Sequence, residues 1–134
     1  MSDYILTSDR ESQERRGKIR TFTGRYVNPL ALTVDDICIE DIAHHLAGSN
    51  RYTGATPVPM NVAQHSLLVA DEFAHWPDRR LRLAALLHDA SEAYLNDMAS
   101  PVKHDPRMAV YREFEAEAMR VIFGKERPAN PGLF

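Results

Sequence analysis

The segment LLHDASEAYLND, residues 86–97, combines an apolar beginning with four side chains that could do chemistry: His88, Asp89, Glu92 and Asp97. An unpaired carboxylate in apolar surroundings is costly, so a leucine-rich helix that carries these groups requires a compensating partner. His88 and Asp89 are adjacent, and on a helix their side chains diverge by about 100°. Both can still reach one large object beside the helix, and a metal ion is such an object.

The spacing around His88 favours a divalent metal site. Glu92 follows His88 by four residues and Asp89 by three, so it overhangs the same position one turn later. His65, on the apolar face of the preceding predicted helix, could approach from the opposite wall. Two imidazoles and a carboxylate suit Mn²⁺, Co²⁺, Fe²⁺ or Zn²⁺, and Mg²⁺ is a further option for the expected cofactor. Such an ion would acidify a bound water and polarise a phosphoryl oxygen, while Glu92 would move a proton or orient that water.

Simpler interpretations of the single residues stay open beside this one. A lone histidine on an apolar face is most often a hydrogen-bonded core histidine, and a His-Asp dipeptide occurs by chance in many chains. The joint occurrence of an inward His65, the His88–Asp89 pair and a carboxylate one turn later is harder to explain as solvated surface. The other histidines lack comparable partners and are expected to be surface or packing residues, although the last could line the mouth of the site: His44, His45, His75 and His104.

Composition limits the class of protein. The chain has 134 residues, of which 44% are hydrophobic and 26% charged, as expected for one globular domain. The net charge of -3 provides no basic surface for a nucleic acid polymer, although one local arginine could hold a small phosphate ester. The single cysteine, Cys38, excludes a disulfide framework and a thiolate-rich zinc site, and we expect a buried spectator thiol.

Hydropathy predicts no membrane partner. No uninterrupted apolar run approaches the roughly 18 residues of a membrane span, and the first residues, MSDYILTSDRESQERR, contain no apolar signal segment. We therefore expect a cytoplasmic protein.

The first 30 residues contain no helical pattern. Residues 1–20 are polar and charge-rich and are expected to be a flexible start. The following RTFTGRYVNPL alternates aromatic and polar residues around Gly24, which predicts an extended or hairpin-like segment.

Residues 33–48 predict the first helix. Acidic residues crowd its first turn, and Gly48 stands where a C-terminal cap belongs. Its apolar residues fall at helical spacing: Ile39, Ile42 and Leu46.

Residues 48–60 predict a loop, since they contain two glycines and two prolines. This loop carries Arg51 and Tyr52. Asn61 is then expected to cap a second helix. The inner face of this helix would consist of residues at steps of three and four: Val62, His65, Val69 and Phe73.

The WPD sequence at residues 76–78 ends the second helix, and Asp78 can cap a third helix over residues 79–96. The inner face of the third helix would contain apolar and small residues: Leu81, Ala84, Leu87 or His88, Ser91 and Leu95.

A connection with two prolines leads to a last helix, from about Pro106 to Phe123, which Gly124 closes. Its apolar stripe would be Tyr111, Phe114, Ala118, Val121 and Ile122. Its charged residues are expected to form a solvated face: Arg112, Glu113, Glu115, Glu117 and Arg120. Four helices with short links argue for an all-α domain over residues 21–124, followed by an irregular tail at residues 125–134.

Several segments together resemble the HD-domain metal-dependent phosphohydrolases, in particular the YfbR-like 5′-deoxynucleotidases and the short HD hydrolases of bacteria and phages. The matching segments are NRY (50–52), NVAQHS (61–66), LLHDASEAYLND (86–97) and SPVKH (100–104). With ICIEDIAHHLA, which resembles the short hydrolases, they span roughly residues 20–120. The resemblance implies an HD-domain helical bundle, preceded here by the short extended or hairpin-like segment.

The resemblance also implies roles for single residues. His65, His88 and Asp89 would be metal ligands, and Glu92 would act on the attacking water.

Three further residues match substrate contacts of the nucleotidases. Asp97 matches a position that contacts the sugar, and Arg51 matches the phosphate-binding arginine. Tyr52 stands where those enzymes have a tryptophan against the sugar face, which keeps an aromatic wall but leaves selectivity for deoxyribose open. A loop cation at Arg51 and a helix-end carboxylate at Asp97 are the structural alternatives.

One ligand of the family pattern has no match. The pattern ends with an aspartate on a later helix, and this sequence has no aspartate after Asp105, which precedes the last predicted helix. The carboxylates beyond it are Glu113, Glu115, Glu117 and Glu126. Three alternatives follow: the sequence is truncated, a glutamate or a water replaces the aspartate, or the metal affinity is weaker. A lost carboxylate would leave more of the metal charge uncompensated and define the coordination geometry less well.

The sequence therefore predicts a metal-dependent phosphohydrolase that cleaves a phosphate ester of a small nucleotide, above all a (deoxy)nucleoside 5′-monophosphate. The alternatives are a non-catalytic HD-like module that binds a metal or a nucleotide, and a purely structural helical protein. A homodimer is compatible with the resemblance, and the apolar stripe of the last helix would suit it.

Overall fold

The computed structural model describes residues 16–126, and the structural statements below concern these residues. They form a mostly helical fold with one small two-stranded sheet, which is compatible with the expected all-α class and its hairpin-like segment. The expected flexible start at residues 1–20 and the expected tail at residues 125–134 lie mostly outside the described residues.

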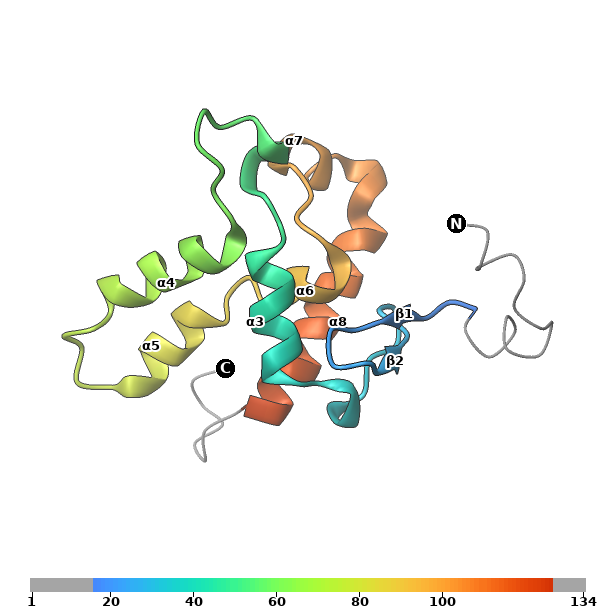
Figure 1. The fold of residues 1–134 in the computed structure, drawn as a ribbon, viewed down its shortest axis with the longest axis horizontal. Helices are drawn as coiled ribbons and strands as arrows, with labels where there is room; N and C mark the ends of the chain where they lie inside the picture. Colours follow the sequence, from blue (N-terminus) through green and yellow to red (C-terminus); the bar gives the residue numbers. More distant parts are fainter. Residues whose placement is uncertain (1–15, 127–134) are drawn as a thin grey trace.

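The elements in chain order are β1 (Ile19–Arg20), β2 (Tyr26–Val27), η1 (Val34–Asp36), α3 (Ile39–Ala47), η2 (Arg51–Gly54), α4 (Val62–Glu72), α5 (Arg79–Leu86), α6 (Glu92–Leu95), α7 (Ser100–Lys103), η3 (Pro106–Met108) and α8 (Ala109–Glu126). Figure 1 shows α3 near the centre, with the α4–α5 pair on one side and the β1–β2 hairpin on the other. Helix α3 packs against α4 and α6, and α8 contacts η1, η3 and α7. No helix among residues 16–126 has both the length and the apolar character of a membrane span.

The predicted hairpin-like segment is confirmed. Strands β1 and β2 pair antiparallel, with Ile19 opposite Val27 and Arg20 opposite Tyr26. Gly24 lies in the turn at φ +92°, a left-handed conformation that glycine adopts without steric cost.

Asp41 of α3 anchors this hairpin to the helices. Its side chain is fully buried, and its carboxylate accepts hydrogen bonds from the Thr23 backbone N–H at 2.8 Å and the Thr23 hydroxyl at 3.0 Å. Burial acts to raise the pKa of Asp41, but these hydrogen bonds outweigh it and the pKa lies below its usual range. His45 adds a second link, because its Nε2 accepts from the Phe22 N–H at 3.1 Å and its Nδ1 lies 2.8 Å from the Ala93 carbonyl oxygen.

We expect Asp41→Ala to lower the free energy of unfolding by about 2 kcal/mol, since it removes the fully buried carboxylate to which the Thr23 N–H and hydroxyl donate. Urea unfolding followed by circular dichroism measures the change. The exposed neighbour Glu40 provides the control, because Glu40→Ala should change stability by no more than about 0.5 kcal/mol. Equal losses in the two variants would contradict the anchoring role of Asp41.

Helix α4 begins as predicted but is rotated relative to the prediction. The Asn61 side chain accepts from the Gln64 N–H at 2.8 Å, and the Gln64 side chain accepts from the Asn61 N–H at 3.0 Å, which completes a capping box. The predicted inner face is shifted, because α4 packs against both α3 and α5 and the stripe between them is buried. That stripe is Val62, Ser66 and Ala70, whereas His65, Val69 and Phe73 are half-buried at its edge.

The single helix predicted over residues 79–96 is wrong. Asp78 caps α5 by accepting from the Arg80 N–H at 3.0 Å, but α5 ends at Leu86 and a series of tight turns leads to α6. Residues 90–94 are all buried, which one face of a straight helix does not allow. The break lets this segment pass through the core while His88 and Asp89 lie on the turn.

The C-terminal part differs from the prediction in two respects. Helix α7 was not predicted, and α8 continues through Gly124 to Glu126 instead of ending at Gly124. Ala118 and Ile122 of the predicted apolar stripe of α8 are buried within the fold, and the rest of the stripe, Tyr111, Phe114 and Val121, is half-buried. Cys38, expected to be buried, is half-buried before α3.

The charged residues of α8 do not form one solvated face. Glu113, Glu117 and Arg120 are exposed as predicted. Arg112 and Glu115 are instead half-buried, against the prediction, because both contact the segment around Lys103.

Candidate functional site

Three of the predicted residues converge on one point. His65 comes from α4, and His88 and Asp89 come from the turn between α5 and α6. Asp89 Oδ2 lies 2.9 Å from His88 Nε2 and 3.3 Å from His65 Nε2. One ligand atom from each residue lies within 4.8 Å of the others, and this is the single such group of three among residues 16–126.

A backbone contact fixes the orientation of His88. Its Nδ1 lies 2.6 Å from the Ala85 carbonyl oxygen, which can only accept, so Nδ1 carries the proton. Nε2 faces the Asp89 carboxylate at 2.9 Å, so it donates to that carboxylate when the ring is protonated and offers a lone pair to an ion once that proton leaves. Metal-binding histidines usually have their second nitrogen held in this way. The residues present therefore fit a divalent ion by the orientation of His88 and by their donor set of two imidazoles and a carboxylate.

The electrostatics favour the metal-binding form of His65 and Asp89, whereas at His88 a metal ion would have to displace a proton. Burial, together with the nearby Arg51 guanidinium, lowers the pKa of His65 and favours the neutral imidazole. The hydrogen bond from His88 and its charge outweigh burial at Asp89, so the pKa of Asp89 lies below its usual range. The same contact with Asp89 raises the pKa of His88. An ionised carboxylate between two imidazoles is ready to receive a cation.

Glu92 is the buried acid beside this group. Its side chain is only 6% exposed at the first residue of α6. Burial, with the charges of Asp89 and Asp97 nearby, raises the pKa of Glu92 to about 8, although Lys103 acts in the opposite direction. A carboxyl group with such a pKa can hold or accept a proton near neutral pH.

All seven predicted site residues line one cavity of about 560 Å³: Arg51, Tyr52, His65, His88, Asp89, Glu92 and Asp97. The cavity wall also includes Lys103 and His104, the histidine that could line the mouth of the site. Lys103 was part of the quoted SPVKH segment but had no predicted role, and no sequence pattern marked Glu115, its partner on α8.

The turn Arg51–Gly54 brings two of these residues to the cavity in a strained backbone. Tyr52, Thr53 and Gly54 have φ of +53°, +56° and +77°. A left-handed conformation is costly for a tyrosine and especially for the β-branched threonine. The Arg51 guanidinium lies over the Tyr52 ring, 4.6 Å from its centroid. Such strain is concentrated at binding sites in proteins, which agrees with the position of this turn.

We expect Thr53→Gly to raise the free energy of unfolding by about 1 kcal/mol, because glycine adopts the left-handed conformation without the steric penalty. Ala55 of the same loop has an ordinary φ of -77° and provides the control. There the glycine substitution should lower stability, since it only increases the freedom of the unfolded chain. Urea unfolding of both variants checks the difference, and a loss of stability in Thr53→Gly would contradict the strain.

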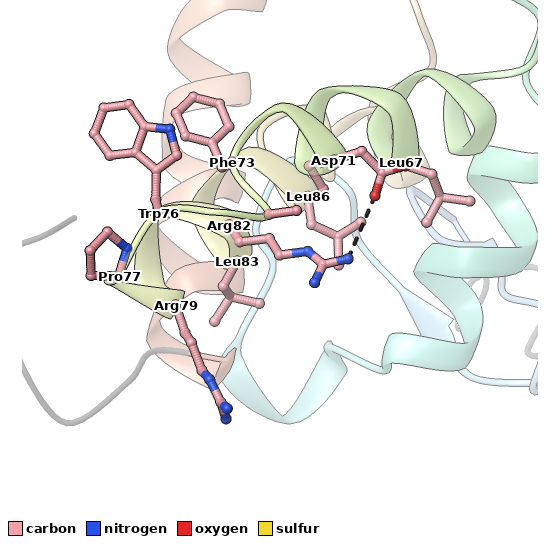
Figure 2. Close-up of a pocket in the computed structure, with 11 residues that line it drawn as sticks. Leu67, Asp71, Phe73, Trp76, Pro77, Arg79, Arg82, Leu83 and Leu86 are labelled. Carbon is pink, nitrogen blue, oxygen red and sulfur yellow. Dashed lines mark ion pairs between the residues drawn. The ribbon is translucent and has the colours of Figure 1, made fainter.

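A second cavity, of about 610 Å³, lies on the α4–α5 pair (Figure 2). Its wall is largely apolar, with Leu67, Phe73 and Trp76 among its residues, and Arg82 pairs there with Asp71 at 3.6 Å. It contains no histidine, no cysteine and a single carboxylate. The residues that could do chemistry are therefore gathered in the cavity with His88, and the larger cavity does not share them.

No protein-family model matches this chain. The chain is 48% identical over 94 residues to "Uncharacterized protein RCAP_rcc00048" of Rhodobacter capsulatus, a match that covers 66% of this chain and 48% of that protein. It is 38% identical over 89 residues to "Uncharacterized protein YfdR" of Escherichia coli strain K12, with 63% and 46% covered. The chain thus spans about half the length of the curated relatives it matches.

Proposed function

We propose that this chain is a metal-dependent phosphohydrolase of the HD-domain type, acting on (deoxy)nucleoside 5′-monophosphates. The observation that carries the proposal is the convergence of His65, His88 and Asp89 on one wall of a cavity that also contains Arg51 and Glu92. In the HD-domain enzymes that the sequence resembles, the matching residues bind one metal ion and must therefore lie close together. The contacts of Asp89 with His65 and His88 support the proposal.

A divalent ion bound by the three residues would supply an acidified water and polarise a phosphoryl oxygen. Arg51 is always cationic and would bind the phosphate oxygens in the cavity. Glu92 would accept a proton from the attacking water as the new P–O bond forms. The ester P–O bond would then break, and the leaving sugar oxygen would take up a proton from the protonated Glu92 or from solvent, so that the nucleoside leaves as an alcohol.

Two residues of the cavity would hold the nucleoside part. The Tyr52 ring would cover the sugar face, and the Asp97 carboxylate would accept a hydrogen bond from a sugar hydroxyl. Aromatic rings and carboxylates in these roles tolerate both ribose and deoxyribose, so the proposal extends to both classes of monophosphate.

Release of inorganic phosphate tests the proposal. Purified protein loaded with Mn²⁺ or Co²⁺ is incubated with ribo- and deoxyribonucleoside mono- and triphosphates, beside a known nucleotidase as control. We expect release from monophosphates that requires the added ion and stops with a chelator. The proposal is wrong if the whole panel stays intact while the control enzyme cleaves it.

The second candidate is a non-catalytic module that binds a metal or nucleotide. The observation that favours it is the small ligand set, because among residues 16–126 the group contains one carboxylate and two histidines. This function predicts nucleotide binding by calorimetry without phosphate release. Turnover that disappears in Glu92→Ala, with an unchanged circular dichroism spectrum, would exclude it.

A further inference from the structure

Lys103 connects three helices at the edge of the candidate site. Its Nζ lies 3.0 Å from Glu115 Oε2 on α8 and 4.0 Å from Glu92 Oε1 on α6. The Lys103 side chain is 20% exposed and the Glu115 side chain 16% exposed, so the contact is largely shielded from water. Burial acts to lower the pKa of Lys103, but the ion pairs with Glu115 and Glu92 outweigh it and raise the pKa.

The part of α8 that carries Glu115 is held against the site by two neighbouring side chains. The Tyr111 hydroxyl donates to the carbonyl oxygens of Leu95 at 3.0 Å and Asn96 at 2.8 Å. The Arg112 guanidinium donates to the Lys103 carbonyl oxygen. These bonds fix α8 relative to the end of α6 and the end of α7, so Glu115 is held in place against Lys103.

Glu115 differs from the other members of the group in one respect. Lys103 and Glu92 line the cavity, whereas Glu115 does not. Glu115 therefore does not touch a substrate in the cavity, and its ion pair with Lys103 is its contact with a residue of the cavity wall. A lysine without such a partner has a long flexible side chain that would not stay in one place.

We propose that Glu115 is a positioning residue, which holds the Lys103 ammonium group beside Glu92 so that the Glu92 carboxylate keeps a fixed place in the cavity wall. The consequence for catalysis rests on the proposed function, in which Glu92 accepts a proton. The contact itself does not depend on that function, and the two can be tested separately.

A double-mutant cycle on phosphate release tests the catalytic consequence in the metal-loaded chain. Lys103→Met and Glu115→Gln should each lower kcat by about tenfold and leave KM within about twofold, because both loosen the same carboxylate. The double variant should lose no more than Lys103→Met alone, since Glu115 acts only through Lys103. Lys103→Arg keeps the charge and should retain kcat within about threefold, and the exposed Glu113→Gln on α8 is the matched control.

Chemical modification of Lys103 in the metal-free protein provides a readout that needs no activity. The rate of acylation by an amine-reactive ester, followed by peptide mass spectrometry, should rise at least about threefold in Glu115→Gln, because the amine is freer and less protonated. It should not change in Glu113→Gln. Faster acylation supports the inference even if the wild type releases no phosphate, a result that would remove the proposed function alone. An unchanged acylation rate, or multiplicative losses of kcat in the double variant, would overturn the inference.

Discussion

Glu92→Gln is expected to lower kcat for phosphate release by about 10³-fold in the metal-loaded protein. Glutamine has the same shape but cannot accept the proton of the attacking water. Because Glu92 is not one of the three converging ligand residues, KM and the metal content should stay close to those of the wild type. Steady-state kinetics with a deoxynucleoside monophosphate, beside elemental analysis of the same samples, measures both.

The matched control for this experiment is Glu113→Gln, which replaces an exposed carboxylate on α8 and should leave kcat unchanged. A Glu92→Gln enzyme within tenfold of the wild type would remove Glu92 from the proton transfer. Loss of metal in Glu92→Gln would instead assign Glu92 to the ligand set.

The second large effect is expected in the stability of the metal-free protein as a function of pH. The pKa of Glu92 is raised to about 8 in the folded state, from 4.5. Between these values the folded state binds more protons than the unfolded state, so the free energy of unfolding falls as pH rises. The part due to Glu92 is fully present below about pH 4.5 and is largely lost by about pH 8, and the whole of it amounts to about 5 kcal/mol.

Glu92→Gln isolates this contribution because glutamine does not titrate. Urea unfolding between pH 5 and pH 8, with a chelator present, should show the wild type losing stability relative to Glu92→Gln by about 3 kcal/mol. Titrating groups that do not interact with Glu92 affect both proteins equally and cancel in the difference. If the difference in free energy of unfolding between the two proteins stays constant from pH 5 to pH 8, folding does not raise the pKa of Glu92, and this prediction is wrong.

The expected effects on kcat and on stability both arise from the way in which residues 86–97 accommodate two carboxylates in apolar surroundings. Asp89 is compensated by contacts with His65 and His88. Glu92 lies farther from its cationic neighbour Lys103, at 4.0 Å, and is compensated by holding a proton. Asp89 is thus ionised beside the histidines, whereas Glu92 holds a proton near neutral pH, and the proposed hydrolysis requires Glu92 to lose that proton, which a cation bound beside Asp89 would favour.

Local signals in the sequence predicted much of the fold. The caps at Asn61 and Asp78 were predictable because the side chain and the N–H groups it accepts from are a few residues apart. The end of α5 at Leu86 was not, because the apolar pattern continues through it. Only the packing of residues 90–94 against their surroundings requires the break, and that packing has no local signal.

The same limit applies to the candidate site. His65, His88 and Asp89 were predicted to meet because their residue types are unusual in apolar segments, and the structure brings them together. Glu115 was predicted as solvated, since a carboxylate on a charged helix face has no pattern that distinguishes it from its neighbours. Its ion pair with Lys103 depends on how α8 packs on α7, which is a property of the tertiary fold.

The central claim is that His65, His88 and Asp89 form a metal site, and elemental mass spectrometry of the purified protein tests it most directly. The wild type and the His88→Ala, Asp89→Ala double variant are loaded with Mn²⁺ or Co²⁺, freed of unbound ion and measured together. We expect close to one ion per chain in the wild type and none in the double variant. Absence of metal from the wild type, or equal metal in the two proteins, would contradict it.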